Sequence, residues 1–389
     1  MKYIFFIVLT MIFFASLKRR FRRISVITML VVFLALLLIY PQISLNAAKE
    51  GIELWLFIVI PSLLPFFIIN DMLTSLRVPE NIAVFFKPIA RSLFGTSGYG
   101  AYVFIMSIFA GYPAGARIIA QLIEEKKISD AEGQKILTFS STSGPLFIIG
   151  AVGSGMLKSG IAGYILYASH ILGAVLNGIL LRLFFRNKIE NEKYAASSNL
   201  NSSSSGDILS RGIMTSLITS GFIGGYIILF SVIITLLNKV EFFGILNSFF
   251  TNVLQISLAA SSNICSLLKS SIEISNGSKI LCFSSLDFDL KLIFLSFIIA
   301  FSSLSVIGQV SSVLNKTKIS MKAYVACKVN HGILSSLICY ALLKVNLLNV
   351  KAYNTVRNPF IPDMAFVLII LLILLLVFNI LGSAKCRKR

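Results

Sequence analysis

The chain has 389 residues, of which 56% are hydrophobic and 13% are charged, and it carries a formal net charge of +19 at neutral pH. Soluble domains carry about 25% charged residues, so this composition excludes a soluble globular protein. Several apolar runs reach the roughly 20 residues that a helix needs to cross a bilayer core. We therefore expect an all-α polytopic membrane protein surrounded by membrane lipid.

The basic residues gather at the ends of apolar runs, at residues 18–23, 182–188 and 385–389. This distribution is typical of the positive-inside rule for membrane proteins. A protein that binds single-stranded nucleic acid would instead alternate its cations with aromatic platforms, and no such pattern is evident. The charge therefore indicates membrane orientation and no nucleic-acid partner, and nothing in it points to a particular oligomeric state.

The first apolar run, Met1 to Leu17, precedes the basic stretch "KRRFRR", and no small-residue cleavage site follows it. The charge lies on the wrong side for a signal peptide, so we expect an additional first membrane helix. A second helix is predicted from Ile24 to Tyr40, because the residue before a proline disfavours the helical conformation and Pro41 comes next. A loop is expected from Pro41 to Glu50.

Two prolines, Pro61 and Pro65, interrupt the apolar run from Ile52 to Asn70. Proline removes a backbone donor and its ring clashes with the preceding turn, so a helix here should bend or break. Broken backbone is tolerated at membrane depth only inside protein or beside a watery cavity. Two interpretations remain open, a buried hairpin and a plain kinked helix.

Further membrane segments flank a polar, serine-rich stretch from Asn187 to Gly206, which is too poor in apolar side chains to pack. The segments before it are a basic amphipathic connection from Arg77 to Arg91 and apolar runs at 98–109, 134–156 and 161–185. The segments after it are apolar runs at 213–237, 244–260, 290–307, 333–343 and 364–381. With re-entrant helical hairpins allowed, we expect roughly eight to ten passes across the membrane.

These segments divide the chain into five parts. Residues 1–23 form the additional helix and its basic loop, 24–186 the first membrane half, 187–206 a linker, 207–350 the second half, and 351–389 a last helix with a basic tail. The halves share one weak match, between "GARIIAQLIEEKKIS" from Gly115 and "GQVSSVLNKTKIS" from Gly308. Weak internal two-fold repeats of this kind are typical of secondary transporters.

Arg117 is the first candidate functional residue, because it stands just past the break "GYP" between two apolar segments. Pro113 suits the first position of a helix, so Arg117 would lie about one turn inside a short helix whose amide end points back to the break. A guanidinium inside a membrane is usually functional, and its fork of donors suits carboxylates. The alternative is that Arg117 marks a membrane edge beside Glu124 and Glu125.

A second break, "SSTSGP", supplies hydroxyl groups and free backbone amides just before a new apolar helix. Its members are Ser140, Ser141, Thr142, Ser143, Gly144 and Pro145. Two helix starts and one cation together predict a site for an anion. Gln309 and Asn330 in the second half would complete this pocket as neutral donors and acceptors, although such residues also serve in helix pairing.

Glu273 and His331 are candidate coupling residues. Glu273 lies near Gly277 at a predicted hairpin tip, where a carboxylate either takes a coupling ion or a proton, or is simply a loop charge. His331 can change its charge near neutral pH, although a single histidine is more often a packed, hydrogen-bonded residue.

Catalytic chemistry is not indicated. The sequence contains no triad, phosphate loop, paired-carboxylate motif or cofactor fingerprint, so we predict neither an enzyme nor a cofactor. The five cysteines lack metal-ligand spacing, and two histidines are too few for a histidine-rich site, so no metal is predicted either.

Five stretches resemble a known family: "PSLLPFFII", "GYPAGARIIAQLIEEKKIS", "SSTSGPLFIIGAVGSGM", "IEISNG" and "LSVIGQVSSVLNKTKIS". Together they resemble the sporulation integral membrane protein YlbJ family, whose members carry two nucleoside-recognition Gate domains. The likeness runs from about Ile24 to Leu343, and it is more specific in the first half than after the linker.

The resemblance implies a fold similar to that of concentrative nucleoside transporters, with re-entrant hairpins in each half. It further implies a carrier of dipicolinate, a small aromatic dicarboxylate, across the outer forespore membrane of a spore-forming bacterium. A cation and helix starts suit two carboxylates better than a neutral nucleoside, so the residues are compatible with such a substrate. The alternatives are a nucleoside or ion permease, and a membrane scaffold for sporulation that transports nothing.

Overall fold

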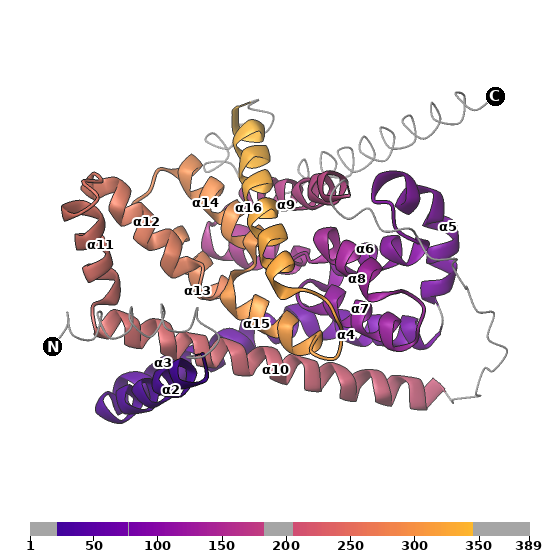
Figure 1. Cartoon of the computed structure of the whole chain (residues 1–389), viewed down its shortest axis with the longest axis horizontal. Helices are drawn as coiled ribbons and strands as arrows, with labels where there is room; N and C mark the ends of the chain where they lie inside the picture. Colours follow the sequence, from indigo (N-terminus) through magenta and orange to yellow (C-terminus); the bar gives the residue numbers. More distant parts are fainter. Residues whose placement is uncertain (1–21, 77, 183–204, 345–389) are drawn as a thin grey trace.

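The computed structural model describes residues 22–76, 78–182 and 205–344, and in these residues it consists of helices and contains no strand (Figure 1). This confirms the predicted all-α fold. The predicted helices at 1–17 and 364–381, and most of the predicted linker at 187–206, lie outside the described residues.

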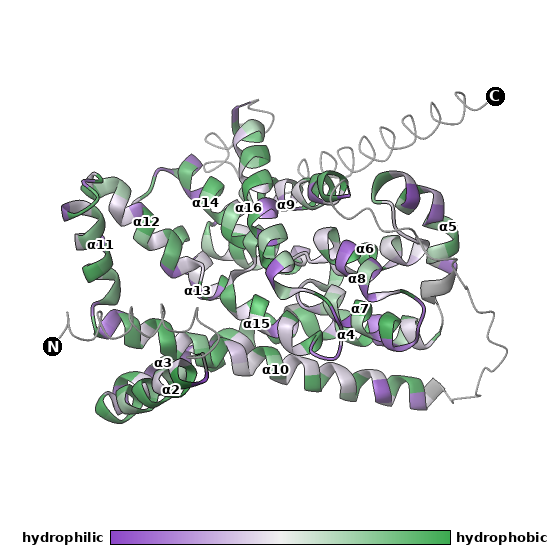
Figure 2. Ribbon diagram, viewed as in Figure 1, coloured by the Kyte–Doolittle hydropathy of each residue, from purple (hydrophilic) through white to green (hydrophobic). Residues whose placement is uncertain are grey.

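Four described segments are long and apolar enough to cross a membrane, and the number rises to six if each of two bent helix pairs counts as one span. Hydrophobic residues cover most of these helices (Figure 2). The four segments are Gly160–Leu181, Gly206–Lys239, Phe288–Val313 and Met321–Lys344. The polytopic character is therefore confirmed, whereas the total of roughly eight to ten passes, which includes segments outside the described residues, stays a prediction.

The chain bends sharply at Pro41. Helix α2 (Arg22–Ile39) stops just before it, and α3 (Pro41–Leu54) begins with it, at an angle of 102° between the two segments. The expected loop from Pro41 to Glu50 is therefore wrong, because these residues are helical. Proline is well suited to this place, since the first turn of a helix has no intrahelical use for its amide hydrogen.

The stretch with Pro61 and Pro65 is a kinked helix and not a hairpin. A single π-helical turn, η1 (Trp55–Val59), joins α3 to α4 (Ile60–Ser75), and the backbone stays helical through both prolines. Pro61 falls in the first turn of α4, where its missing donor matters least, and Pro65 lies inside α4. The π-turn sits next to this first turn, which is how a helix often accommodates a local irregularity.

These N-terminal helices pack along one long helix, α10 (Ser205–Lys239), which runs along the lower edge of the molecule in Figure 1. We call α2, α3, η1, α4 and α10 the frame. We call the remaining described helices, which lie above α10 in Figure 1, the body. The body begins with α5 (Val78–Leu93), and α11 (Phe242–Asn252) leads from α10 into its second part.

The body contains two series of interrupted helices. The first consists of α6 (Gly98–Ala110), α7 (Ala114–Glu124), α8 (Asp130–Ser140), η2 (Leu146–Met156) and the long α9 (Gly160–Leu181). The second consists of α12 (Leu258–Ser270), α13 (Ile274–Cys282), α14 (Phe288–Phe301), α15 (Ser303–Val313) and the long α16 (Met321–Lys344). Each series is thus two broken pairs followed by one unbroken helix, which confirms a two-fold repeat.

The register of the repeat differs from the predicted one. The match between the segments from Gly115 and Gly308 pairs α7 with α15, whereas the order of elements pairs α7 with α13 and η2 with α15. The likeness has a local cause instead. Ser129 and Ser320 both accept a hydrogen bond from an amide of the following helix, and the turn of Ser320 donates to Gln134 of α8 at 2.6 Å.

Two apolar runs are also interrupted where no break was predicted. The run 244–260 splits between Asn252 and Leu258, and the run 290–307 splits at Ser302, whose φ is 77°. A segment that is distant in the sequence stabilises the second split, because the amide of Leu304 donates to the carbonyl of Ser271 at 2.9 Å. The break after α14 is therefore hydrogen-bonded to the break between α12 and α13.

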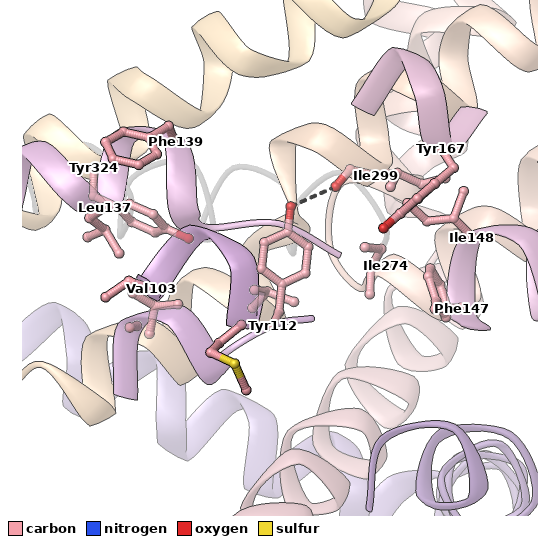
Figure 3. Packing of buried hydrophobic residues seen from close by; sticks show 14 of the residues in the cluster. Val103, Tyr112, Leu137, Phe139, Phe147, Ile148, Tyr167, Ile274, Ile299 and Tyr324 are labelled. Atoms are coloured by element: carbon pink, nitrogen blue, oxygen red, sulfur yellow. Dashed lines mark hydrogen bonds between the residues drawn. The ribbon is translucent and has the colours of Figure 1, made fainter. Parts of the chain in front are cut away.

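The largest cluster of buried apolar residues surrounds the breaks of the body (Figure 3). Tyr112, Phe147, Ile274 and Ile299 come from four different elements, and the Tyr112 hydroxyl donates to the Ile299 carbonyl at 3.0 Å. A second, smaller cluster joins the frame to the body through contacts of the frame with α6 and α7. The packing therefore fixes the breaks beside one another and places the frame against them.

Candidate functional site

A cavity of about 50 Å³ lies where the breaks meet the frame. Its body side consists of Gly111, Tyr112, Ser143, Gly144, Phe147, Glu273, Ile274, Ser275, Val306 and Gln309. Its frame side consists of Val59, Leu63, Ile223 and Ile227. Of the residues predicted from sequence to bind or couple, the structure brings Ser143, Gly144, Glu273 and Gln309 to this cavity.

The first two breaks approach so closely that only glycine fits. A Cβ atom added to Gly111, where φ is +73°, would lie 2.7 Å from the amide nitrogen of Gly144. A Cβ atom added to Gly115 would lie 2.4 Å from the carbonyl oxygen of Ser140. The backbone groups of these two breaks therefore face each other directly, as the glycines in both motifs require.

The strongest charge near the cavity is Lys328 of α16, whose side chain is only 1% exposed. Its Nζ donates to the Tyr112 hydroxyl at 2.9 Å and to the Ser141 carbonyl at 2.8 Å, and lies 3.1 Å from Nδ1 of His331. Nζ also lies 4.8 Å from the centre of the Tyr112 ring, a cation–π distance. Tyr112 thus touches the cavity on one side and the ammonium on the other.

The contacts of Lys328 can accommodate a protonated side chain. The Tyr112 proton is given to Ile299, and a carbonyl such as that of Ser141 can only accept. Nε2 of His331 lies 3.0 Å from the carbonyl of His170 and must donate to it, which leaves Nδ1 of a neutral His331 as an acceptor. With a neutral His331, three acceptors face Nζ, and an ammonium supplies the three N–H groups that they need.

No carboxylate in the described part of the chain pairs with this ammonium. A buried charge without a counter-charge costs several kcal/mol unless hydrogen bonds compensate it. Close by, the amide of Ser143 donates to Nε2 of His170 at 2.8 Å, and the rings of His170 and His331 lie 4.9 Å apart. Buried polar side chains therefore surround Lys328 at the centre of the body.

Glu273 gives the cavity a negative side. It is 1% exposed and caps α13, where Oε2 accepts the amide proton of Asn276 at 2.7 Å. The amide end of α13 is thus already occupied by the chain's own carboxylate. By contrast, η2 begins after Pro145 without any side-chain cap, and Gly144 and Phe147 at its start line the cavity. Glu273 is therefore a buried helix cap beside the cavity, and its role in taking a coupling ion or a proton stays a prediction.

Other residues of the second break hold the structure together. The Ser141 hydroxyl lies 2.8 Å from the Tyr324 hydroxyl, whereas the buried hydroxyls of Ser140 and Thr142 have no hydrogen-bond partner in the described residues. Gln309 donates weakly to the Ser305 hydroxyl at 3.4 Å and is one of the residues that line the cavity.

Arg117 lies elsewhere than predicted. Its guanidinium binds Asp71 of α4 at 3.1 Å and Thr219 of α10 at 2.8 Å, and it is absent from the cavity lining. Asn330 also points elsewhere, since its side-chain amide donates to Asn177 of α9 at 2.7 Å. The structure therefore supports the helix-pairing alternative for Asn330. His331 is buried and hydrogen-bonded, the commoner of its two predicted states.

The four prolines predicted to mark helix breaks divide into two pairs. Pro113 directly precedes α7, and Pro145 directly precedes η2, so both stand at real interruptions. Pro61 and Pro65 stand inside a continuous helical stretch, where Leu63 between them reaches the cavity wall. In the described residues, no three metal-ligating side chains come together.

The sequence interpretation missed Lys328, Tyr112, His170 and Asp71. The signal for Lys328 was present, as a lone lysine one turn before His331 in the stretch "YVACKVNHGIL". A lone ionisable residue in a membrane helix is a functional candidate by default. The other three residues acquire their importance only through contacts with distant parts of the chain.

Two solved structures share this fold, both of doubly substituted variants of the concentrative nucleoside transporter CNTnw in an outward-facing state. One aligns with 87% of this chain and 91% of its own length at a TM-score of 0.50, and the other with 88% and 90% at 0.51. Sequence identity is 14% in both, so the likeness concerns the fold. No family model matches the chain. The apolar spans and the shared fold define an integral membrane protein with the fold of these concentrative nucleoside transporter structures.

A sequence relative narrows this class. The sporulation integral membrane protein YlbJ of Bacillus subtilis (strain 168) is 31% identical over 337 residues, which are 82% of this chain and 81% of that protein. The chain belongs to the YlbJ family of sporulation integral membrane proteins.

Proposed function

We propose that this protein is a secondary transporter of a small anion, and that its substrate is dipicolinate, carried across the outer forespore membrane during sporulation. One observation carries the proposal. Lys328 holds an ammonium at the meeting point of the helix breaks, and no carboxylate in the described residues neutralises it.

Burying that charge without a counter-charge is unfavourable for the folded state. An unpaired buried charge raises the energy of the folded state by several kcal/mol, and an anion placed in the cavity would lower it again. The anion would lie across the Tyr112 ring from Nζ, beside the uncapped amide end of η2. A helix start carries about half a positive charge, so both features attract the same ligand.

The cavity of about 50 Å³ holds a few water molecules and is smaller than an aromatic dicarboxylate. Substrate entry therefore requires one wall to move. The frame wall is apolar and consists of Val59, Leu63, Ile223 and Ile227. The body wall mixes apolar residues with polar ones that are hydrogen-bonded within the body. Separation of the frame from the body would enlarge the cavity without breaking the cluster around Lys328.

The proposed roles follow from these positions. Ser143, Gly144 and Gln309 contact the substrate, and Lys328 takes the role of counter-charge that the sequence suggested for Arg117. Glu273 faces the same cavity with a negative charge, so it takes up a proton together with the anion. His331 positions Lys328.

A nucleoside is the second candidate substrate, because Glu273 and Gln309 offer acceptors that suit sugar hydroxyls. The fold shared with CNTnw is compatible with it. Competition between labelled dipicolinate and unlabelled nucleoside distinguishes the two.

Uptake by reconstituted vesicles tests the proposal. Vesicles with the wild-type protein should accumulate labelled dipicolinate, and a proton gradient should change the rate. Lys328→Gln should reduce uptake by about tenfold or more, because it removes the buried charge behind the cavity residue Tyr112, while Lys322→Ala, an exposed lysine on the same helix, should not. Absence of uptake by the wild type would leave the scaffold function, and normal uptake by Lys328→Gln would contradict the assignment of the site.

A further inference from the structure

We propose that Lys328 is a tethered monovalent cation. Its ammonium occupies a cation site built from helix-break ligands, so this chain needs no soluble sodium or potassium ion at that place. The inference deepens the proposed function, and its uptake experiment rests on that function. Its binding experiment uses only inorganic and ammonium salts and does not depend on any substrate.

The ligands of Nζ are those of a cation site. A carbonyl oxygen from the break after α8, a hydroxyl from the break before α7, and an imidazole nitrogen from α16 lie 2.8, 2.9 and 3.1 Å from it. The C-terminal end of a helix carries about half a negative charge, and Ser141 caps that end of α8. In membrane carriers, the carbonyl ends of interrupted helices commonly coordinate the coupling cation.

The ligands keep their orientation through contacts of their own. Tyr112 is held by its donation to Ile299 at 3.0 Å, and His331 is held by the His170 carbonyl at 3.0 Å. His170 in turn accepts from the amide of Ser143, which is part of the second break. Supporting hydrogen bonds of this kind are characteristic of metal sites, where they fix ligand direction.

This arrangement predicts what remains when the ammonium is removed. Lys328→Ala would leave a hydroxyl, a carbonyl and an imidazole around a space the size of a lysine side chain. Because three lone pairs would then face an unsolvated space, a small monovalent cation should bind there and restore the lost hydrogen bonds and charge. Lys328→Met keeps the volume of the stem but removes the charge, so it leaves no room for a cation.

Thermal unfolding of the purified full-length protein in detergent tests the site. The probes are ammonium chloride, sodium chloride and potassium chloride, with tetramethylammonium chloride at equal ionic strength as a cation too large to enter. Ammonium or sodium should raise the midpoint for Lys328→Ala by about 2 to 4 °C over tetramethylammonium. The wild type, Lys328→Met and the surface control Lys322→Ala should not distinguish the salts.

Several outcomes would overturn the inference. They are a wild type that small cations stabilise selectively, a Lys328→Ala variant that responds equally to all four salts, and a Lys328→Met variant that responds as Lys328→Ala does. If Lys328→Ala can be purified only in ammonium or sodium, the inference is supported. If it cannot be purified in any of the salts, small cations do not replace the ammonium and the inference is wrong.

Vesicle uptake of dipicolinate adds a functional readout. Wild-type uptake should be the same in sodium and in tetramethylammonium, whereas uptake by Lys328→Ala should fall about tenfold and recover in ammonium. Sodium-dependent uptake by the wild type would contradict the tethered cation but not the transport function. A wild type that transports nothing would contradict the transport function, while the cation selectivity of Lys328→Ala in thermal unfolding would still support the site.

Discussion

Arg117 on α7 donates to the carboxylate of Asp71 on α4 at 3.1 Å, and this ion pair ties the body to the frame. Both side chains are partly buried. The pair also involves α10, because Thr219 accepts from the guanidinium at 2.8 Å and Ser216 donates to Asp71 at 3.4 Å. The arginine that the sequence marks as functional is thus a contact between the two parts whose separation would open the cavity.

A double-mutant cycle should detect this pair. Arg117→Ala leaves a partly buried carboxylate without its partner, so we expect a loss of about 1 to 3 kcal/mol in the free energy of unfolding. Adding Asp71→Ala should restore part of the loss, with a coupling energy of about 1 kcal/mol. Denaturant or thermal unfolding measures both.

Glu125→Ala is the matched control for this cycle, since the pair of Glu125 with Lys127 is more exposed and should contribute at most about 0.5 kcal/mol. Additive losses at Arg117 and Asp71 would contradict the coupling. Dipicolinate uptake by Arg117→Ala should fall less than uptake by Lys328→Gln, because only Lys328 adjoins the cavity through Tyr112.

Much of the fold could be predicted because its signals are local. Glycine and proline mark the breaks at 111–113 and 141–144, and hydropathy marks the long helices. The break at Ser302 has neither glycine nor proline, and its backbone is held by hydrogen bonds from Leu304 and Ser305 to a segment some thirty positions earlier. The sequence pattern therefore shows one continuous apolar run there.

The candidate site was only partly predictable because tertiary contacts determine which groups a charged side chain pairs with. The sequence distinguishes Arg117 by its place after a break, but Asp71, which neutralises it, stands 46 positions away. Lys328 looks like an ordinary helix residue until Tyr112 and Ser141, 216 and 187 positions away, meet it. Residues inside a break, such as Gly144 and Glu273, were easier to find because the break itself faces the cavity.

Asn330 should matter for stability and not for substrate affinity. Its amide bonds to Asn177, which in turn donates to the Thr138 carbonyl at 2.6 Å and so joins α16, α9 and α8. Asn330→Ala should lower the free energy of unfolding by about 1 kcal/mol and leave the apparent KM for uptake unchanged. Gln309→Ala, in the cavity lining, should raise the apparent KM for uptake and leave the free energy of unfolding nearly unchanged. A raised KM in Asn330→Ala would return this residue to the substrate site.

Gly115 should tolerate no side chain. A Cβ atom there would lie 2.4 Å from both the Ser107 hydroxyl and the Ser140 carbonyl, so alanine must push α7 away from the second break. We expect Gly115→Ala to destabilise the protein by about 1 to 3 kcal/mol and to reduce uptake. Gly221→Ala on α10 is the control, since nothing lies within 4 Å of its added Cβ and it should be neutral or slightly stabilising. Equal stability of the two variants would show that the breaks are not in tight contact.

Glu273 combines two roles that two substitutions can separate. Glu273→Gln keeps an oxygen that accepts from the Asn276 amide, so the cap of α13 should survive, whereas Glu273→Ala should lose about 1 kcal/mol of folding free energy. Both variants remove the negative charge from the cavity. If this charge takes up the coupling proton, dipicolinate uptake by Glu273→Gln should proceed at a rate that no longer responds to a proton gradient. Vesicles with and without the gradient measure this, and the stability of Glu273→Gln confirms that the loss is not due to unfolding. Uptake that keeps the wild-type response to the gradient would assign the proton to another group and leave Glu273 with its capping role alone.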